Sequence, residues 1–408
     1  MRFAVVGGGI AGLAAAWELS SARPDGDEVV VYEPGALGGK LRTSTFAGRA
    51  VDEGADAFLA RVPWGRELCD ELGLGDALVV PANAAAYVAG GQALHRLPAG
   101  LVLGVPTDAE ALRGSPLVSE AAVERVAAEP AKPGVPLGVD DDVSVGALIR
   151  ERFGDEVLER LVDPLIGGIN AGDSDRLSVR AAVPQIADAA TRSTSLVEGL
   201  RAAAPTAPGP VFWSHPGGMG AIVTALVESL RRRRVRFVAE AVDSLTGLDA
   251  DRIVVATPAP VTAGLVGGEA ARLLRALGHS SPVLVAIELA RADVRHPLDA
   301  SGLLVPRAEG RLLTACSFAT TKWTHLDTDP ATVVLRASAG RYGDDTAIDL
   351  SDDTVVERLL GDLDELLGID GAPSAVRVSR WRDGFPQYEP GHLRRVAAIE
   401  TDIAARWP

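Results

Sequence analysis

The chain has 408 residues, a formal net charge of −15, 47% hydrophobic residues and 23% charged residues. This composition is that of a globular protein and excludes wholesale disorder, and the length suits about two or three domains. The acidic balance argues against nucleic acid as a partner, because phosphate binding requires positive charge. With only 2 cysteines and with 6 histidines at no metal-binding spacing, we expect no disulfide framework and no metal site.

The first fifty residues predict a βαβ unit. Residues 3–6 are typical of a buried parallel strand, residues 10–20 of a helix, and residues 29–32 of a second strand, which follows a polar turn at 23–27. Glu33 ends the second strand. The segment between the first strand and the helix has the pattern G-x-G-x-x-G and comprises Gly7, Gly8, Gly9, Ile10, Ala11 and Gly12.

Each part of this pattern has a physical task in dinucleotide binding. Gly7 permits the tight turn, Gly9 lets a pyrophosphate approach the backbone, and Gly12 lets the helix pack closely on the strand. The helix N-terminus offers N–H groups and the positive end of its dipole to phosphates. Glu33 can accept hydrogen bonds from ribose hydroxyls. The first fifty residues therefore predict a dinucleotide site.

Two later segments favour a flavin over a nicotinamide. A second glycine loop at residues 37–43 contains Gly39 and Lys40, and residues 51–58 contain an Asp-x-Gly segment. In order and spacing, these segments resemble the amine oxidase-like flavoproteins, in which FAD lies extended and is contacted along its length. The resemblance implies that FAD also contacts Gly54, Ala55, Asp56 and Ala57.

The middle and end of the chain narrow the resemblance. Residues 94–98, 161–178, 212–226, 251–259 and 381–392 are similar, in the same order, to segments of the oxygen-dependent protoporphyrinogen and coproporphyrinogen oxidases. The family continues past residue 408 with a strand, a glycine loop and a helix that complete its flavin site. We therefore expect the given sequence to lack that tail, and an inactive truncated flavoprotein stays an alternative.

The resemblance implies an α/β fold of the amine oxidase type. A Rossmann-like FAD-binding domain would comprise residues 1–85, 205–260 and 380–408. Residues 86–204 would form a mainly helical insertion on the substrate and membrane-facing side, and residues 261–379 a mixed α+β substrate domain. Residues 235–245 would form a strand whose backbone meets the adenine at Val242.

A porphyrinogen carries carboxylates, which require cationic partners. Arg96, next to an expected hairpin at 87–98, is one candidate, and an exposed arginine on a turn is the alternative. Asn170 either lines the substrate cavity or caps a helix C-terminus. Gly217 and Gly218 either allow close approach of flavin or substrate or are ordinary loop glycines. No residue stands out as a catalytic base.

The function implied is oxidation of coproporphyrinogen III to coproporphyrin III by FAD and molecular oxygen in haem biosynthesis, with release of hydrogen peroxide. Protoporphyrinogen IX oxidation is the near alternative, and another flavin amine oxidase or a desaturase is a further one. No apolar run is long enough to span a bilayer. We expect a cytoplasmic protein with at most peripheral membrane contact and transient contact with other enzymes of haem biosynthesis.

Overall fold

The computed structural model describes residues 1–21, 27–132, 134–204 and 209–407, so most of the polar turn predicted at 23–27 lies outside the described residues. The chain divides into two compact units. Unit 1 comprises Met1–Pro81, Gly209–Leu277 and Ala397–Pro408, and unit 2 comprises Ala82–Pro208 and Gly278–Val396. The domain boundaries expected at 85/86, 204/205, 260/261 and 379/380 stay a prediction.

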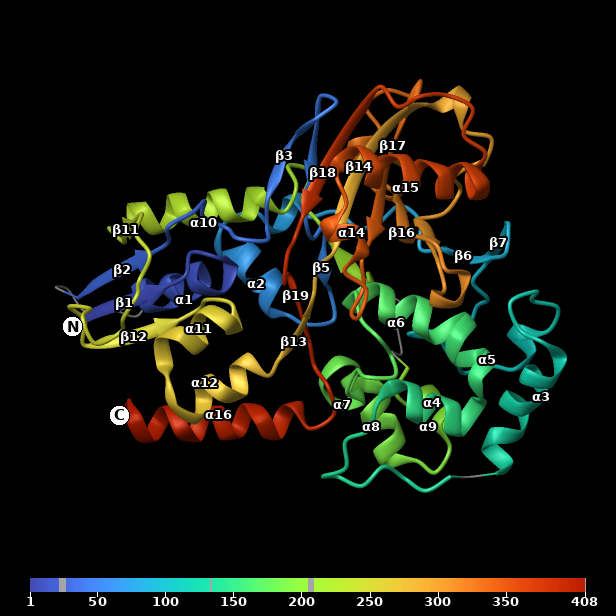
Figure 1. Cartoon of the computed structure of the whole chain (residues 1–408), viewed down its shortest axis with the longest axis horizontal. Coiled ribbons are helices and arrows are strands. Elements are labelled where there is room, and N and C mark those ends of the chain that lie inside the picture. The colour runs from blue at the N-terminus through green and yellow to red at the C-terminus, as the bar shows by residue number, and fades with distance from the viewer. Residues whose placement is uncertain (22–26, 133, 205–208, 408) are drawn as a thin grey trace. The chain divides into compact units, whose positions relative to one another are not determined.

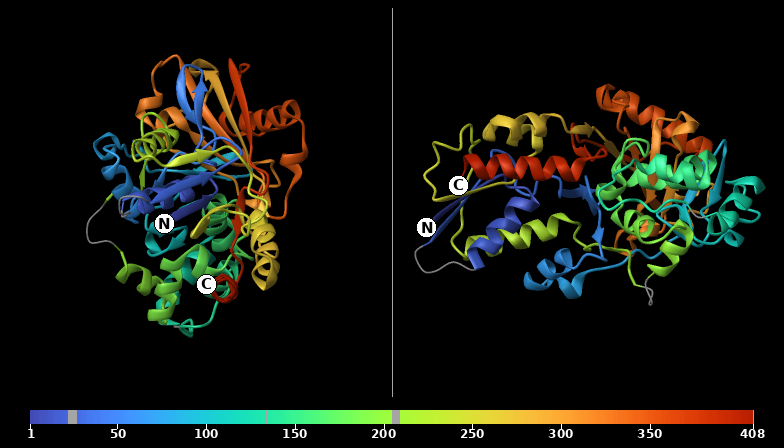
Figure 2. Two further views of the ribbon diagram at one scale, coloured as in Figure 1. Left: turned by 90° about the vertical axis from the view of Figure 1, so that its left-hand side faces the viewer. Right: turned by 90° about the horizontal axis from the view of Figure 1, so that it is seen from below.

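Unit 1 is built on a parallel sheet of four strands in the order β11-β2-β1-β12. Parallel sheets are covered on both faces, which explains the valine-rich strands. Figures 1 and 2 show α1 and α10 on one face, and α11, α12 and the end of α16 on the other. The strands are β1 (Arg2–Val6), β2 (Glu28–Tyr32), β11 (Arg236–Val238) and β12 (Arg252–Val255), and the helices are α1 (Ile10–Ser21), α10 (Gly220–Arg232), α11 (Ala259–Val266), α12 (Gly268–Arg275) and α16 (His392–Arg406).

Shorter elements complete unit 1. A hairpin joins β3 (Thr43–Phe46) to β4 (Arg49–Asp52), β5 (Phe58–Leu59) pairs with β10 (Phe212–Trp213), and α2 (Trp64–Glu71) follows β5. The predicted first strand, first helix and second strand are confirmed as β1, α1 and β2.

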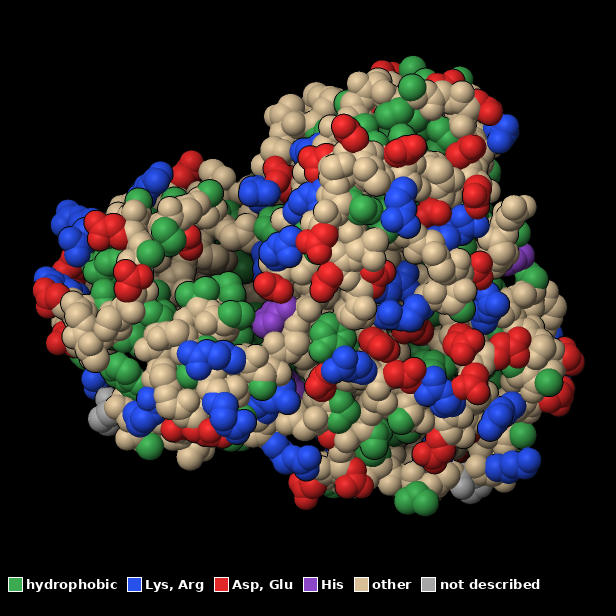
Figure 3. Space-filling view, in the orientation of Figure 1, with side chains coloured by type: hydrophobic (Ala, Val, Ile, Leu, Met, Phe, Trp, Pro, Cys, Tyr) green, Lys and Arg blue, Asp and Glu red, His purple; other side chains and the backbone are tan. Residues whose placement is uncertain are grey.

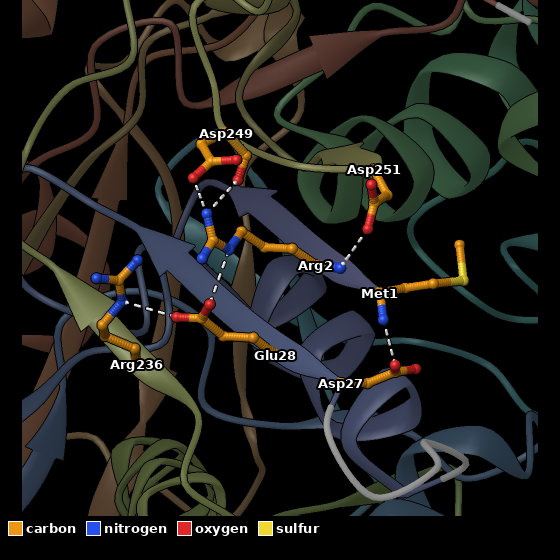
Figure 4. Close-up of polar contacts among 7 residues, drawn as sticks. All are labelled: Met1, Arg2, Asp27, Glu28, Arg236, Asp249 and Asp251. Carbon is orange, nitrogen blue, oxygen red and sulfur yellow. Dashed lines mark hydrogen bonds and ion pairs between the residues drawn. The ribbon is translucent and has the colours of Figure 1, made fainter.

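Ion pairs and a backbone hydrogen bond connect the amino ends of the parallel strands (Figure 4). Glu28 accepts from Arg2 Nε at 2.8 Å and contacts Arg236 Nε at 3.3 Å, and the backbone N–H of Arg2 donates to Asp251 at 2.7 Å. Arg2 also pairs with Asp249, and the terminal amine with Asp27. The glycine loops and Glu33 lie at the opposite, carboxyl edge of this sheet.

Unit 2 contains a mixed sheet of seven strands in the order β18-β14-β17-β16-β15-β6-β7. One face packs against α15 (Asp352–Leu367) through an apolar core. The expected hairpin at 87–98 is confirmed as β6 (Tyr87–Gly90) and β7 (Ala93–Arg96). The other strands are β14 (Val283–Ala290), β15 (Gly302–Leu304), β16 (Leu313–Phe318), β17 (Thr332–Ala339) and β18 (Ala375–Arg380); small pairs are β8 (Leu101–Val102) with β9 (Val105–Pro106) and β13 (Gly278–Ser280) with β19 (Phe385–Gln387).

Helices form the remainder of unit 2 and enclose a second apolar core. In the sequence, a capping serine at Ser144 and apolar positions up to Leu161 predict one helix over this stretch, but the structure has a shorter one. Ser144 caps α4 through the N–H of Ala147 at 3.1 Å, but α4 ends before Gly154, where φ is +88°. The helices around this core are α3 (Glu120–Ala128), α4 (Val145–Phe153), α5 (Asp155–Val157), a π-helical turn (Leu158–Val162), α6 (Asp163–Asn170), α7 (Val179–Ala182), α8 (Pro184–Arg192) and α9 (Leu196–Ala202). Two short helices, α13 (Ala319–Lys322) and α14 (Thr346–Asp349), lie instead beside the mixed sheet.

The predicted strand at 235–245 is wrong in length. β11 covers only Arg236–Val238, and Val242 lies in the loop that follows. Val238 stands opposite Tyr32, the last residue of β2, so the partner strand ends there. A strand cannot continue without a neighbour to satisfy its backbone hydrogen bonds.

The surface carries charges of both signs, interspersed on the face shown in Figure 3. Within the described residues, no helix combines the length and the apolar character needed to cross a bilayer. The same residues contain no cluster of three or more His, Cys, Asp or Glu side chains suited to a metal ion.

Candidate cofactor and substrate sites

The first glycine loop (residues 7–12) leads from β1 into α1. The N–H of Gly7 donates to Tyr32 O at 2.9 Å, and Gly7 has a φ of +108°. A Cβ atom on Gly7 would lie 2.7 Å from Ala256 O, and one on Gly12 only 1.9 Å from Gly7 O. The tight turn and the close helix approach expected at these two glycines are therefore present, and neither position has room for a side chain.

Gly9 differs from its neighbours, because a Cβ built there would have no atom within 4 Å. Open space thus lies beside the backbone at the N-terminus of α1, where Ile10 and Ala11 begin the helix. A helix N-terminus attracts anionic groups through its N–H groups and its dipole. A pyrophosphate at this position, as the sequence predicts, stays a prediction.

Glu33 lies at the same edge of the sheet, directly after β2. Its Oε2 accepts from the N–H of Gly8 at 2.8 Å, and its Oε1 accepts from the N–H of Gly35 at 2.8 Å. The carboxylate therefore joins the first glycine loop to the segment after β2. Its predicted role as a ribose partner stays a prediction.

The second glycine loop (residues 37–43) lies against the first. Gly38 donates its N–H to Gly8 O at 2.8 Å, and a Cβ on Gly39 would lie 3.2 Å from Gly9 Cα. Gly38 also abuts α10, since its Cβ would lie 2.8 Å from Val223 Cγ1. Lys40, within this loop, is exposed. Two motifs separated in the sequence thus form one cradle.

Contacts that the sequence analysis missed fix the N-terminus of α10. Asp52 Oδ1 accepts from the N–H of Met219 at 2.9 Å, and Thr43 Oγ1 accepts from the N–H of Gly220 at 2.8 Å. The Thr43 hydroxyl also bonds to Asp52. Gly218 has a φ of +75°, and a Cβ there would lie 2.4 Å from Thr43 Cγ2. The Asp-x-Gly pattern that begins at Asp52 was a feature of the sequence from which the role of Asp52 could have been predicted.

The predicted flavin contacts at residues 54–57 follow this anchor. Glu53 donates its N–H to Arg42 O at 2.8 Å, and Asp56 O accepts from Ser214 Oγ at 2.7 Å. The segment is thus tied at both ends, with Ala55 exposed between them. Val242 is half-buried and packs with the core that contains Val6.

Unit 2 holds Arg96 and Asn170, and both already have partners. Arg96 pairs with Asp299 and lies over the Tyr87 ring at 5.1 Å from its centroid. Asn170 Nδ2 donates to Ile166 O at 2.8 Å at the end of α6, which agrees with the capping alternative. Gly217, in unit 1, donates its N–H to His215 Nδ1 at 3.0 Å. Substrate contacts at these residues and at Gly218 stay predictions.

A parallel sheet with two adjoining glycine loops at its carboxyl edge, together with a mixed sheet in a second unit, defines an amine oxidase-like flavoprotein fold. Residues 10–405 match the family model described as "Flavin containing amine oxidoreductase". The chain belongs to this family.

The relatives place the chain among porphyrinogen oxidase homologues. It is 37% identical to the coproporphyrinogen III oxidase of Mycobacterium tuberculosis (strain ATCC 25618 / H37Rv), over 98% of this chain and 90% of the relative. It is 30% identical to that of Bacillus subtilis (strain 168), over 99% and 91%. A crystal structure from Exiguobacterium sp. 255-15, provisionally named a protoporphyrinogen oxidase, has a TM-score of 0.88 and 31% identity, over 100% of this chain and 92% of that one. Reduced UDP-galactopyranose mutase, with a TM-score of 0.71 and 14% identity, shares the fold.

Proposed function

We propose that the chain binds FAD and oxidises coproporphyrinogen III to coproporphyrin III in haem biosynthesis. The observation that carries this proposal is 37% identity to a coproporphyrinogen III oxidase over 98% of the chain. The reaction removes six electrons and six protons from the macrocycle. Three molecules of oxygen take them up, and three molecules of hydrogen peroxide are released.

The residues of unit 1 fit FAD. The open space beside Gly9 and the N-terminus of α1 would hold the pyrophosphate. Glu33 would hold the ribose, Lys40 would add positive charge near the phosphates, and residues 54–57 and Val242 would contact the remainder of the cofactor. When bound, FAD supplies the two-electron acceptor that oxygen regenerates.

The chain's own residues would bind and orient the substrate. The tetrapyrrole is flat and apolar with anionic arms, so its site requires an apolar slot and cations at the rim. Arg96 would serve as such a cation only by exchanging Asp299 for a substrate carboxylate.

The test is a direct assay. The purified chain is loaded with FAD, mixed with coproporphyrinogen III in air, and followed by porphyrin fluorescence and peroxide release, with heat-denatured protein as the control for spontaneous oxidation. We expect one porphyrin for three peroxides. A rate equal to that of the denatured control would refute the proposal.

Protoporphyrinogen IX is the second candidate substrate, because the chain is also 30% identical to the protoporphyrinogen oxidase of Macaca fascicularis over 98% of its length. The same assay with protoporphyrinogen IX decides between them. A kcat/KM at least tenfold higher for coproporphyrinogen III would support the first assignment.

A further inference from the structure

The mixed sheet of unit 2 has two chemically different faces. Along β14 and β17, alternate residues such as Val285, Ile287 and Leu335 enter the apolar core under α15. The residues between them point to the opposite face, because side chains alternate along a strand. On β14, β16, β17 and β18 we call that side the arginine face; it comprises Leu284, Ala286, Glu288, Ala315, Ser317, Val334, Arg336, Ser338, Ala375, Arg377 and Ser379.

The register brings two arginines into one row. Arg336 on β17 stands opposite Ala286 on β14, and Ala286 stands opposite Arg377 on β18. Neighbouring strands lie about 4.8 Å apart, so the two arginines are roughly 10 Å apart at their Cα atoms. Only the methyl group of Ala286 lies between them. The row therefore places two arginines on either side of Ala286.

The face residues of these four strands include more cations than carboxylates. Glu288 is the one carboxylate among the face residues of these four strands, and its Oε1 accepts from Ser374 Oγ at 2.8 Å. Two arginines thus share a surface with one glutamate. Arg336 is only 9% exposed, although it stands in the middle of the sheet. Burying a guanidinium is costly, and stability alone favours an apolar residue at such a position.

Both arginines interact with other groups of the chain, so they are held in place. A guanidinium has five N–H donors in a planar fork, which suits a further carboxylate. The serines on the neighbouring rows, Ser317, Ser338 and Ser379, add hydroxyl donors to the same surface. The surface has the chemistry of a site for a flat ligand with anionic arms.

We propose that the arginine face is the substrate side of unit 2, and that Arg336 and Arg377 bind carboxylates of the tetrapyrrole. This inference rests on the proposed function and names its recognition residues. It would also give a chain with a net charge of −15 two cations at the site that receives a polyanion.

The test measures binding rather than turnover. Coproporphyrin III, the stable product, is titrated into the FAD-loaded protein, and quenching of porphyrin fluorescence reports the Kd. Arg336→Gln and Arg377→Gln should each weaken binding about tenfold, because each removes a charge-assisted contact. Arg336→Lys and Arg377→Lys should restore part of the affinity. Arg295→Gln is the matched control, because Arg295 is exposed and pairs with Asp370 elsewhere in unit 2.

The tetramethyl ester of coproporphyrin III separates carboxylate binding from a structural role. Its affinity should be the same for the wild type and the glutamine variants. Wild-type affinity of both glutamine variants for coproporphyrin III, or an equal loss for the ester, would overturn the inference. If Arg336→Gln does not fold, Arg377→Gln and the two lysine variants decide.

Failure of the two proposals can be told apart. A wild type that binds coproporphyrin III but does not oxidise coproporphyrinogen III contradicts the proposed function alone. A wild type that oxidises it, with glutamine variants of unchanged Kd, contradicts only the assignment of the arginines.

Discussion

The carboxylate of Glu33, at the end of β2, accepts a hydrogen bond of 2.8 Å from the backbone N–H of Gly8 in the first glycine loop. The contact joins two segments whose shared edge of the sheet is the candidate cofactor site. One side chain therefore holds the first glycine loop against the segment that follows β2.

Glu33→Gln should weaken FAD binding by about tenfold, because an amide accepts less strongly than a carboxylate from N–H and O–H donors. The Kd is measured by the change in flavin fluorescence on titration. Glu28→Gln is the control, since Glu28 lies at the other end of the same strand and pairs with Arg2 and Arg236 (Figure 4). Equal effects of both substitutions would contradict the role of Glu33.

Gly9→Ala should separate binding from folding. A Cβ at Gly9 meets no protein atom within 4 Å, so the free energy of unfolding without FAD should change by less than about 0.5 kcal/mol. The same methyl group would occupy the space for the pyrophosphate, so FAD affinity should fall at least tenfold. Urea unfolding and FAD titration are the measurements.

Gly12→Ala should instead destabilise the protein by about 2–3 kcal/mol, because its Cβ would lie 1.9 Å from Gly7 O. Gly264→Ala, inside α11 with no atom within 4 Å of its Cβ, should be neutral or stabilising. A Gly9→Ala variant that loses stability as Gly12→Ala does would show that Gly9 serves packing.

Both cysteines should be unreactive in the folded protein. Burial raises the pKa of the Cys69 thiol to about 11 and that of the Cys316 thiol to about 12, so both are protonated at pH 8. A disulfide reagent that reports thiolates should find no thiol without denaturant and two in guanidinium chloride. The variants Cys69→Ser and Cys316→Ser assign any signal. One fast-reacting thiol at pH 8 would contradict the burial.

Because the thiol pKa values are raised, the free energy of unfolding should also depend on pH in alkaline solution. Unfolded thiols lose their protons from about pH 9, whereas the folded thiols keep theirs up to about pH 11. The unfolded state is therefore favoured as pH rises through this window. The urea midpoint should fall between pH 8 and pH 10, and Cys316→Ala should reduce that fall.

Stability should also decrease on mild acidification. Burial lowers the pKa of His215, of His296 and of His392, so these side chains stay neutral in the folded protein below the pH at which they protonate when unfolded. The unfolded state then binds more protons as pH falls through about 6.5, which destabilises the fold. The urea midpoint should be lower at pH 5.5 than at pH 7.5, and His296→Phe should reduce the difference. A higher midpoint at pH 5.5 would contradict this.

The local structure of this protein was determined by the sequence itself. Valine runs predicted β1 and β2, the glycine spacing predicted the turn into α1, and Ser144 was recognised as a helix cap. These features depend on the spacing of residues and on backbone freedom within a few positions, so the local sequence is sufficient to predict them. Several motifs that resemble those of a known family, in the same order along the chain, were then sufficient to predict the family.

Contacts between distant segments were decided only by the tertiary structure. The bond of Asp52 to Met219, the pairing of Arg96 with Asp299, and the row of Arg336, Ala286 and Arg377 join residues far apart in the chain. The end of β11 at Val238 likewise depends on where β2 ends. Strand partners and register set these relationships, and a single strand's sequence does not specify either, because its own alternation is compatible with several neighbours.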